Sequence, residues 1–219
     1  MSTLRKFIVL IVALLLAAFG IGLQIVASIG LAPFDAFNQA IANAFTLRVG
    51  DVVSIMQIMF VGFQIIVLRK DTTWKLFLQV LVGALLGQFI NLVLADVFLG
   101  QVVLESYFMR VLFLVVGSLW TPIFIGSIMI LDLVTMPVES FAMIVSKKTN
   151  KLFGQVRQYV DIVFLILALI IPLISKDPFT IREGTIISAL TFGPLLNLYM
   201  PIIEKYFIKF CNRKNKITK

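Results

Sequence analysis

Two short segments of the sequence place an acidic residue two positions after a proline. They are Pro33 with Asp35 in GLAPFDAFNQAIANAF and Pro137 with Glu139 in TMPVESFAMIVSKK. Proline is favoured at the first position of a helix, because the N–H that it lacks would be unpaired there, and a nearby carboxylate is stabilised by the positive end of the helix dipole. The segments therefore predict two short helices, each with an acidic group in its first turn.

The chemistry of these acidic groups depends on how deep the short helices lie. Residues 33–45 and 133–146 are too short or too polar to cross a membrane, so they are either re-entrant or interfacial. Re-entrant helices would aim Asp35 and Glu139 into a shared interior cavity from opposite sides, where a carboxylate can exchange a proton or pair with a cationic substrate. Interfacial helices would use the same residues only as caps.

Five further polar residues are candidates for substrate binding or coupling. Arg157 and Asp161 are four positions apart, which is close enough on one helix face for an ion pair. That pair either lines a cavity or lies at the cytoplasmic edge of the membrane. Asp51 stands at the start of an apolar run, and Asn91 and Asn197 lie inside two others. Amides in such runs either hold helices together or line a substrate path.

The amino-acid types that are missing exclude several kinds of site. The chain has no histidine and a single cysteine, Cys211, in a basic C-terminal segment. A histidine-based catalytic pair, a Cys/His metal cluster and an intrachain disulfide are therefore excluded. The carboxylates have no accompanying nucleophile, and the sequence contains no phosphate-binding P-loop. We expect a protein that is not an enzyme and that holds no metal and no cofactor.

Composition indicates that lipid surrounds most of the chain. Of the 219 residues, 60% are hydrophobic and 14% are charged, and the mean hydropathy is +1.06, whereas soluble domains are about half apolar and about a quarter charged. A bilayer core about 30 Å thick needs about 20 apolar residues per helix. Six apolar runs are close to that length, at residues 7–29, 52–68, 76–98, 107–131, 156–174 and 186–201. The first run lacks a signal-peptide cleavage site, so we interpret it as an uncleaved span.

The basic residues predict how these spans are oriented. With the N-terminus in the cytoplasm, four of the 19 Lys and Arg residues fall in outside segments, namely Arg48, Arg110, Lys176 and Arg182. The other fifteen lie on the cytoplasmic side, as the positive-inside rule requires. We therefore expect both termini in the cytoplasm and a bacterial inner membrane as the location. The net charge is +8, but the basic residues flank the apolar runs and form no basic face with interleaved aromatic residues. No nucleic-acid partner is therefore expected.

The sequence contains an internal repeat. A shift of 104 residues, or of 106 near the ends of the halves, aligns glycines, prolines and polar residues. The matched pairs are Gly22/Gly126, Pro33/Pro137, Asp35/Glu139, Phe37/Phe141, Gly50/Gly154, Val52/Val156, Gly87/Gly193 and Asn91/Asn197. Each half has three spans, and three is odd, so the second half must begin on the opposite side of the membrane. Inverted repeats of this kind occur in many secondary transporters, whose substrate sites lie near the midplane between the repeats.

The expected fold is an all-α integral membrane protein with six transmembrane helices. They form two inverted three-helix repeats, and each repeat carries a short extra helix. Residues 1–106 make the first repeat, residues 107–204 the second, and residues 205–219 a basic cytoplasmic tail, all within one membrane domain. Helix breaks are expected at Pro33, Pro137, Gly50 and Gly154.

Several motifs resemble those of a known bacterial family. They are PFD at 33–35, GQVRQYVD at 154–161 and REGTIISALTFGPLLN at 182–197. Over nearly the whole chain the sequence is similar to the YczE/YyaS/YitT-type family of bacterial integral membrane proteins. Members more often carry tryptophan where this chain has Phe34, and a Gly-Pro-Arg-Asp-like stretch where it has 136–139. The resemblance implies a multi-span bacterial membrane protein, sometimes described as a permease, and supplies no catalytic residues.

Three classes of function follow from these observations. The first is a secondary transporter or permease for a small solute, gated by the two proline and acid elements. The second is a membrane partner that assists or regulates another protein, including the substrate-binding subunit of an importer, in which Ala13 and Ala17 would pack on a partner helix. The third is an enzyme within the bilayer. The expected partners are lipid and a small solute, and self-association or a membrane partner protein stays open.

Overall fold

Eight α-helices make up the described part of the chain, and its residues include no strand. The computed structural model describes residues 3–69, 74–95, 98–131 and 133–215. In chain order the helices are α1 (Thr3–Ala27), α2 (Pro33–Ala44), α3 (Val49–Leu68), α4 (Lys75–Val93), α5 (Tyr107–Ile130), α6 (Pro137–Thr149), α7 (Phe153–Ser175) and α8 (Glu183–Asn215). Six of them, all except α2 and α6, are long and apolar enough to cross a membrane. The chain is therefore an all-α, multi-pass membrane protein, as predicted.

The last helix is longer than the sequence predicted. α8 continues to Asn215, although the predicted span ends at residue 201 and Pro194 and Pro201 lie inside the helix. Proline is tolerated in membrane helices where neighbouring groups satisfy the backbone carbonyl that it frees. The basic tail at 205–219 is thus helical as far as Asn215, and residues 216–219 lie outside the described part of the chain.

The two short helices begin at the two prolines, as predicted. Pro33 and Pro137 occupy the first turns of α2 and α6, and the residues before them, Ala32 and Met136, have non-helical backbone angles. α6 therefore covers Pro137–Thr149 and not 133–146. Each short helix packs against α3 and α7, which belong to different halves of the chain. This enclosure by long helices fits the re-entrant alternative.

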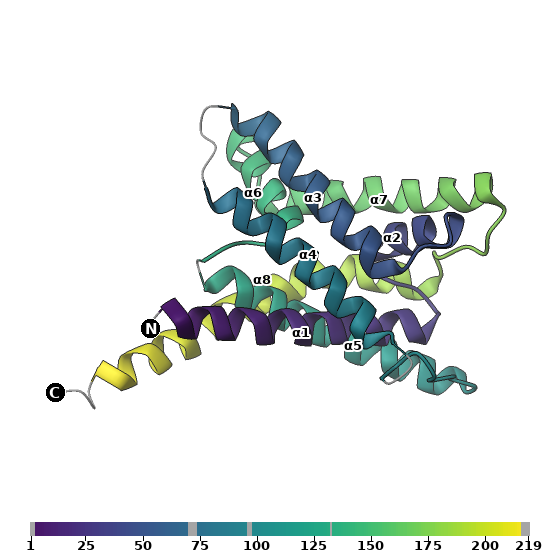
Figure 1. The fold of residues 1–219 in the computed structure, drawn as a ribbon, viewed down its shortest axis with the longest axis horizontal. Helices are drawn as coiled ribbons and strands as arrows, with labels where there is room; N and C mark the ends of the chain where they lie inside the picture. Colours follow the sequence, from purple (N-terminus) through teal and green to yellow (C-terminus); the bar gives the residue numbers. More distant parts are fainter. Residues whose placement is uncertain (1–2, 70–73, 96–97, 132, 216–219) are drawn as a thin grey trace.

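The helices lie in two groups (Figure 1). One group contains α2, α3, α6 and α7, which contact one another. The other contains α1, α4, α5 and α8, in which α1 packs on α4 and α5, and α5 packs on α8. We call these the short-helix layer and the scaffold layer. Direct helix contacts between the layers are made mainly by α3 with α4, and more sparsely by α7 with α8.

The corresponding first helices of the two halves run in opposite directions. Lys6 near the start of α1 donates to the carbonyl of Leu131 at the end of α5, with an Nζ to O distance of 3.2 Å. Farther along α1, the carbonyl of Leu16 accepts a hydrogen bond from Nε1 of Trp120 at 3.0 Å. The start of α1 and the end of α8 lie at the same end of the molecule (Figure 1). This antiparallel pairing fits an inverted repeat.

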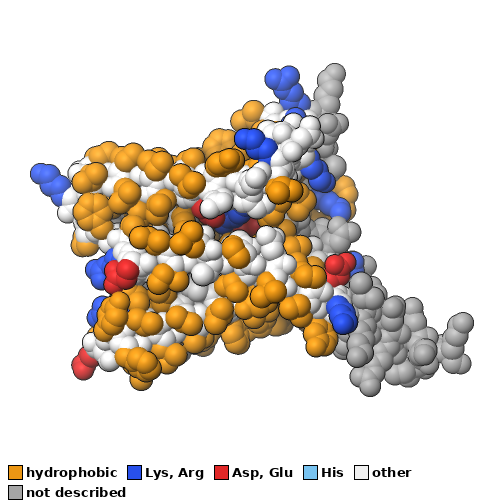
Figure 2. Space-filling view, turned by 180° about the vertical axis from the view of Figure 1, so that it is seen from behind, with side chains coloured by type: hydrophobic (Ala, Val, Ile, Leu, Met, Phe, Trp, Pro, Cys, Tyr) orange, Lys and Arg blue, Asp and Glu red, His pale blue; other side chains and the backbone are white. Residues whose placement is uncertain are grey.

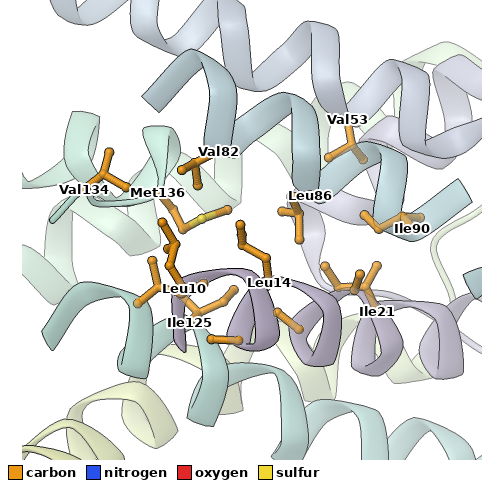
Figure 3. Packing of buried hydrophobic residues seen from close by; sticks show 14 of the residues in the cluster. Leu10, Leu14, Ile21, Val53, Val82, Leu86, Ile90, Ile125, Val134 and Met136 are labelled. Carbon is orange, nitrogen blue, oxygen red and sulfur yellow. The ribbon is translucent and has the colours of Figure 1, made fainter. Parts of the chain in front are cut away.

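The core of the scaffold layer is built on α1. Figure 3 shows branched apolar side chains of α1 between those of α4 and α5, with Val53 of α3 and two residues before α6 at the edge of the cluster. Hydrophobic burial drives little association inside a bilayer, because lipid tails are as apolar as the side chains, so close packing stabilises such a core. Ala13 and Ala17 are buried in it. These small residues therefore bring helices of this chain together and present no free face to a partner helix.

Aromatic contacts in the short-helix layer repeat with the 104-residue shift. The ring centroids of Phe37 and Phe164 are 5.2 Å apart, and those of Phe141 and Phe60, the shifted counterparts, are 5.3 Å apart. Phe60 and Phe164 also contact each other at 5.7 Å, so a residue meets its own counterpart there. A pseudo-two-fold axis through this pair would relate the two halves. The contacts are those that the predicted repeat requires.

The first half closes tightly where α3 meets α4, and we call this contact the α3–α4 seam. The N–H of Gly50 donates to Oδ1 of Asn91 at 2.9 Å, and the hydroxyl of Ser54 lies 3.2 Å from the carbonyl oxygen of Ala84. A Cβ on Gly50 would lie 1.9 Å from the carbonyl oxygen of Gly87, which is a severe overlap. Only glycine therefore permits this approach of the two backbones.

The second half has the equivalent residues Gly154, Gly193 and Asn197 where α7 meets α8, and we call this contact the α7–α8 seam. It is parted, because the two helices do not pack closely there. A Cβ on Gly154 would meet nothing closer than Nδ2 of Asn197 at 3.8 Å, and a Cβ on Gly193 would meet nothing within 4 Å. The polar residues of this seam, Gln155, Gln158 and Asn197, are exposed. The two halves thus share a sequence device and differ in how closely it packs.

Replacing Gly50 by Ala should destabilise the protein, because the methyl group overlaps the backbone of α4. The expected loss is about 1–3 kcal/mol or more, as for other overpacked cores. Gly154→Ala is the matched control, because its methyl group makes only ordinary contacts and Ala favours a helix, so we expect no loss. Thermal unfolding of the purified proteins in detergent measures both. Equal losses in the two variants would contradict the difference between the seams.

Candidate functional site

A small cavity lies where the two layers meet. Its volume is about 40 Å³, which is enough for water or a few non-hydrogen atoms. Every one of the eight helices contributes at least one lining residue. Charged and amide residues from α1, α2, α3, α6 and α7 face it, namely Gln24, Asp35, Gln57, Glu139 and Arg157. The cavity is therefore the place at which both halves present polar groups.

The two short helices bring their acidic residues to this cavity. Asp35 and Glu139 each stand in the first turn of a helix that begins at a proline. Both line the cavity, Asp35 partly buried and Glu139 buried, so the expected convergence of the two residues is the arrangement observed. The positive ends of the two helix dipoles point toward the same space, which favours negative charge there.

Arg157 is the basic group of the cavity. Its guanidinium forms a buried ion pair with Asp161 one turn later on α7, and its Nε lies 3.7 Å from Oε1 of Glu139. The same guanidinium stacks over Phe192 of α8 at 5.4 Å from the ring centroid. Relative exposures of the Arg157, Asp161 and Glu139 side chains are 7%, 10% and 5%. Arg157 therefore lies inside the protein and not at the cytoplasmic edge of the membrane.

Asp51, Asn91 and Asn197 lie elsewhere. Asp51 pairs with Arg48 at 2.8 Å and accepts hydrogen bonds from Gln88 at 3.1 Å and Asn91 at 2.8 Å. This network lies at the end of the α3–α4 seam and does not line the cavity. Asn197 is exposed on the α7–α8 seam. The structure brings four of the candidate residues together and leaves these three on the seams, together with Gly50 and Gly154.

Several lining residues were not predicted from the sequence. Ser118 and Thr121 of α5 face the cavity, as do Ser188 and Thr191 of α8, and the hydroxyl groups of Ser118 and Ser188 lie 3.3 Å apart. Both pairs have a spacing of three residues, which puts the two hydroxyls on one helix face. A pair of hydroxyl residues at that spacing inside an apolar run was therefore a sequence signal that could have identified these lining residues. Gln24 and Gln57 are the remaining polar lining residues outside the predicted candidates, and Gln24 stands alone in α1 and gives no such pattern.

The surface around the site is mostly apolar. Figure 2 shows hydrophobic side chains over most of one face, with basic and acidic side chains mainly at its two ends. Acidic and basic atoms are also visible in a recess near the middle of that face. A band of hydrophobic surface between charged ends is the distribution that a bilayer requires.

Removing the charge of Arg157 should destabilise the protein strongly, because Asp161 would keep a buried charge without a partner. We expect Arg157→Gln and Asp161→Asn each to cost about 3–5 kcal/mol, and the double variant to cost much less than the sum. Thermal unfolding in detergent tests this cycle.

The exposed Arg48 and Asp51 pair provides the matched control. Arg48→Gln should cost no more than about 1 kcal/mol, because water screens that pair. Strictly additive effects of Arg157→Gln and Asp161→Asn would show that the buried pair contributes no coupling.

The sequence is similar to that of a known family and of one curated bacterial protein. Residues 4–201 match the family described as "Family of unknown function (DUF6198)". The chain is also similar to a Bacillus subtilis (strain 168) protein described as "Uncharacterized protein YyaS", with 24% identity over 198 residues, which cover 90% of this chain and 93% of the relative. No solved structure matches the chain. The expected resemblance to a YyaS-type family is confirmed, and the chain belongs to the DUF6198 family.

Proposed function

We propose that this protein is a secondary transporter that moves a small solute through the central cavity by alternating access. The observation that carries the proposal is the difference between the two seams, one closed and one parted, on either side of a cavity shared by both halves. Inverted repeats in different packing states are the basis of alternating access in several transporter folds. Exchange of the two packing states between the halves would open the cavity to the opposite side of the membrane.

The polar residues of the parted seam support such an exchange. Gln155, Gln158 and Asn197 are exposed, and their side chains make no hydrogen bond within the described residues. Amides of membrane helices commonly hydrogen-bond to a neighbouring helix, and a second state would pair these three in that way. Closure of α7 on α8 in the manner of α3 on α4 would supply partners for these groups. The loosely packed interior of the α7–α8 seam leaves room for that movement.

The candidate residues divide between the two tasks of a transporter. Asp35, Glu139, Arg157 and Asp161 form the solute or proton site, since they lie at or beside the cavity. The seam residues Asp51, Asn91 and Asn197, with the paired glycines, form the gates. In each state one seam would form its polar contacts and the other would break them. Binding of a solute or proton in the cavity would then favour one of the two states.

A second candidate function uses the same parted seam. A membrane partner protein could cover Gln155, Gln158 and Asn197 with a helix of its own, and the chain would then assist or regulate that partner without transport. The burial of Ala13 and Ala17 removes the small-residue face proposed for an importer subunit. We therefore place transport first.

The location proposed for the protein is the bacterial inner membrane, with both termini in the cytoplasm. In a Cys211→Ser background, Lys151→Cys should react with an impermeant thiol reagent only in everted vesicles, and Arg182→Cys only in right-side-out vesicles. The two positions lie in segments on opposite sides of α7, and both side chains are exposed. Labelling of both positions from the same side would refute the six-span topology.

Alternating access predicts that one thiol in the cavity is reachable from both sides. Ser188→Cys in the Cys211→Ser background should react with a charged methanethiosulfonate in right-side-out and in everted vesicles. Gly193→Leu should reduce the reaction from the outside by about tenfold or more, because the side chain holds α7 away from α8 and a tight seam loses about 1–3 kcal/mol when overpacked. The reaction from the cytoplasm should persist.

Gly62→Leu is the matched control for that experiment. A Cβ on Gly62 also meets nothing within 4 Å, but Gly62 lies on α3 and outside the α7–α8 seam. It should leave both reactions unchanged. Reaction from one side only, in the protein without Gly193→Leu, would favour the accessory function over transport.

A further inference from the structure

We infer that the central cavity binds a small protonated amine, held by carboxylates and by two amide oxygens that have no hydrogen-bond donor within the protein. Binding of the amine depends on the cavity alone, whereas its passage across the membrane rests on the proposed transport function.

The charges around the cavity are unequal. Asp35 and Glu139 line the cavity and Asp161 pairs with Arg157 beside it, so among the described residues three carboxyl groups accompany one guanidinium. Arg157 is engaged by Asp161 and approached by Glu139, and Asp35 makes no hydrogen bond or ion pair with another described residue. Buried charges persist where an opposite charge lies close by. A cation in the cavity would supply that charge at the side of Asp35.

Two amide oxygens add a requirement for hydrogen-bond donors. Gln24 Nε2 donates to the hydroxyl of Thr121 at 3.3 Å, and that hydroxyl donates to the carbonyl of Gly117 at 2.9 Å. The direction of this chain fixes the amide of Gln24 with its oxygen as the free acceptor. Oε1 of Gln24 and Oε1 of Gln57 are both buried without a partner, and both residues line the cavity at 3% exposure. Buried acceptors of this kind normally have donors.

The residues that line the cavity favour an amine over an anion and over a bare metal ion. An anion would have Arg157 and the N-termini of α2 and α6 in its favour, but it would meet the carboxyl groups of Asp35 and Glu139, with that of Asp161 beside Arg157. An alkali ion would need several oxygens converging at one point, whereas the polar groups here come from different helices and alternate with Phe34, Met136 and Phe192. Aromatic and apolar side chains suit the carbon groups of an organic cation and attract its charge. A cavity of about 40 Å³ limits the bound part to a few non-hydrogen atoms.

Methylammonium is the probe that tests the inference, with tetramethylammonium and sodium as comparison cations. Calorimetric titration of the purified protein at constant ionic strength should show saturable binding of methylammonium. Tetramethylammonium has the same charge and no N–H, so its binding should be at least about tenfold weaker. Sodium should not compete with methylammonium. Equal binding of methylammonium and tetramethylammonium, or binding of sodium alone, would overturn the inference.

Gln57→Met supplies a variant whose fold should survive. Gln57 makes no hydrogen bond to a described residue, so a side chain of similar volume removes an unsatisfied acceptor and should leave the Tm unchanged or higher. Methylammonium binding should fall about tenfold or more. Gln101→Met, the same change on an exposed residue between α4 and α5 and outside the cavity, should leave binding unchanged. Unchanged binding in Gln57→Met would remove the proposed acceptor site.

Flux separates this inference from the proposed transport. Uptake of labelled methylammonium into proteoliposomes is measured beside the titration. Binding without uptake would support the amine site and contradict transport of that amine. Two-sided thiol access at Ser188→Cys without methylammonium binding would support transport and overturn the amine site.

Discussion

The guanidinium of Arg157 is the group on which the arrangement of the site depends. Arginine stays charged in proteins, so a guanidinium inside a membrane protein needs anionic partners within reach. Asp161 supplies one from the next turn of α7, and Glu139 supplies another from α6, with its Oε1 3.7 Å from Nε of Arg157. α6 meets this need because it begins at a proline in the interior and carries its acid in the first turn. The ion pairs of Arg157 with Asp161 and Glu139 thus hold α6 against α7 at a depth that apolar packing alone would not define.

The aromatic contacts of the short-helix layer fit a two-fold repeat, whereas the packing at its boundary with the scaffold layer differs between the halves. The aromatic pairs Phe37/Phe164 and Phe60/Phe141 have nearly equal separations, as equivalent positions of a repeat would. The halves differ most where that layer meets the scaffold layer, which it contacts tightly along α4 and loosely along α8. A small rotation of one layer over the other would produce a difference at this interface.

Much of this fold could be predicted from the sequence, because bilayer thickness sets helix length and Pro33 and Pro137 fix where the short helices begin. Apolar runs and prolines are local signals, and they also placed Asp35 and Glu139 on matching helices. The neighbours of each helix are not local, so the sequence did not separate Asp51, which joins a surface network, from Asp161, which pairs with a buried arginine. It also ended the last helix at Pro201, since the groups that satisfy a proline break come from the surroundings.

The contact between Phe60 and Phe164 has a further consequence for the charges around it. The 104-residue shift maps Arg157 onto Val53 and Asp161 onto Gln57, so the two halves carry different groups at equivalent positions near the axis. Two separate copies of a single half would present every charge in duplicate, with either two guanidiniums facing each other or none. Covalent union of the halves frees each member of such a pair to diverge. A fused chain can therefore carry an odd number of positive charges at its centre, whereas a symmetric dimer of identical halves cannot.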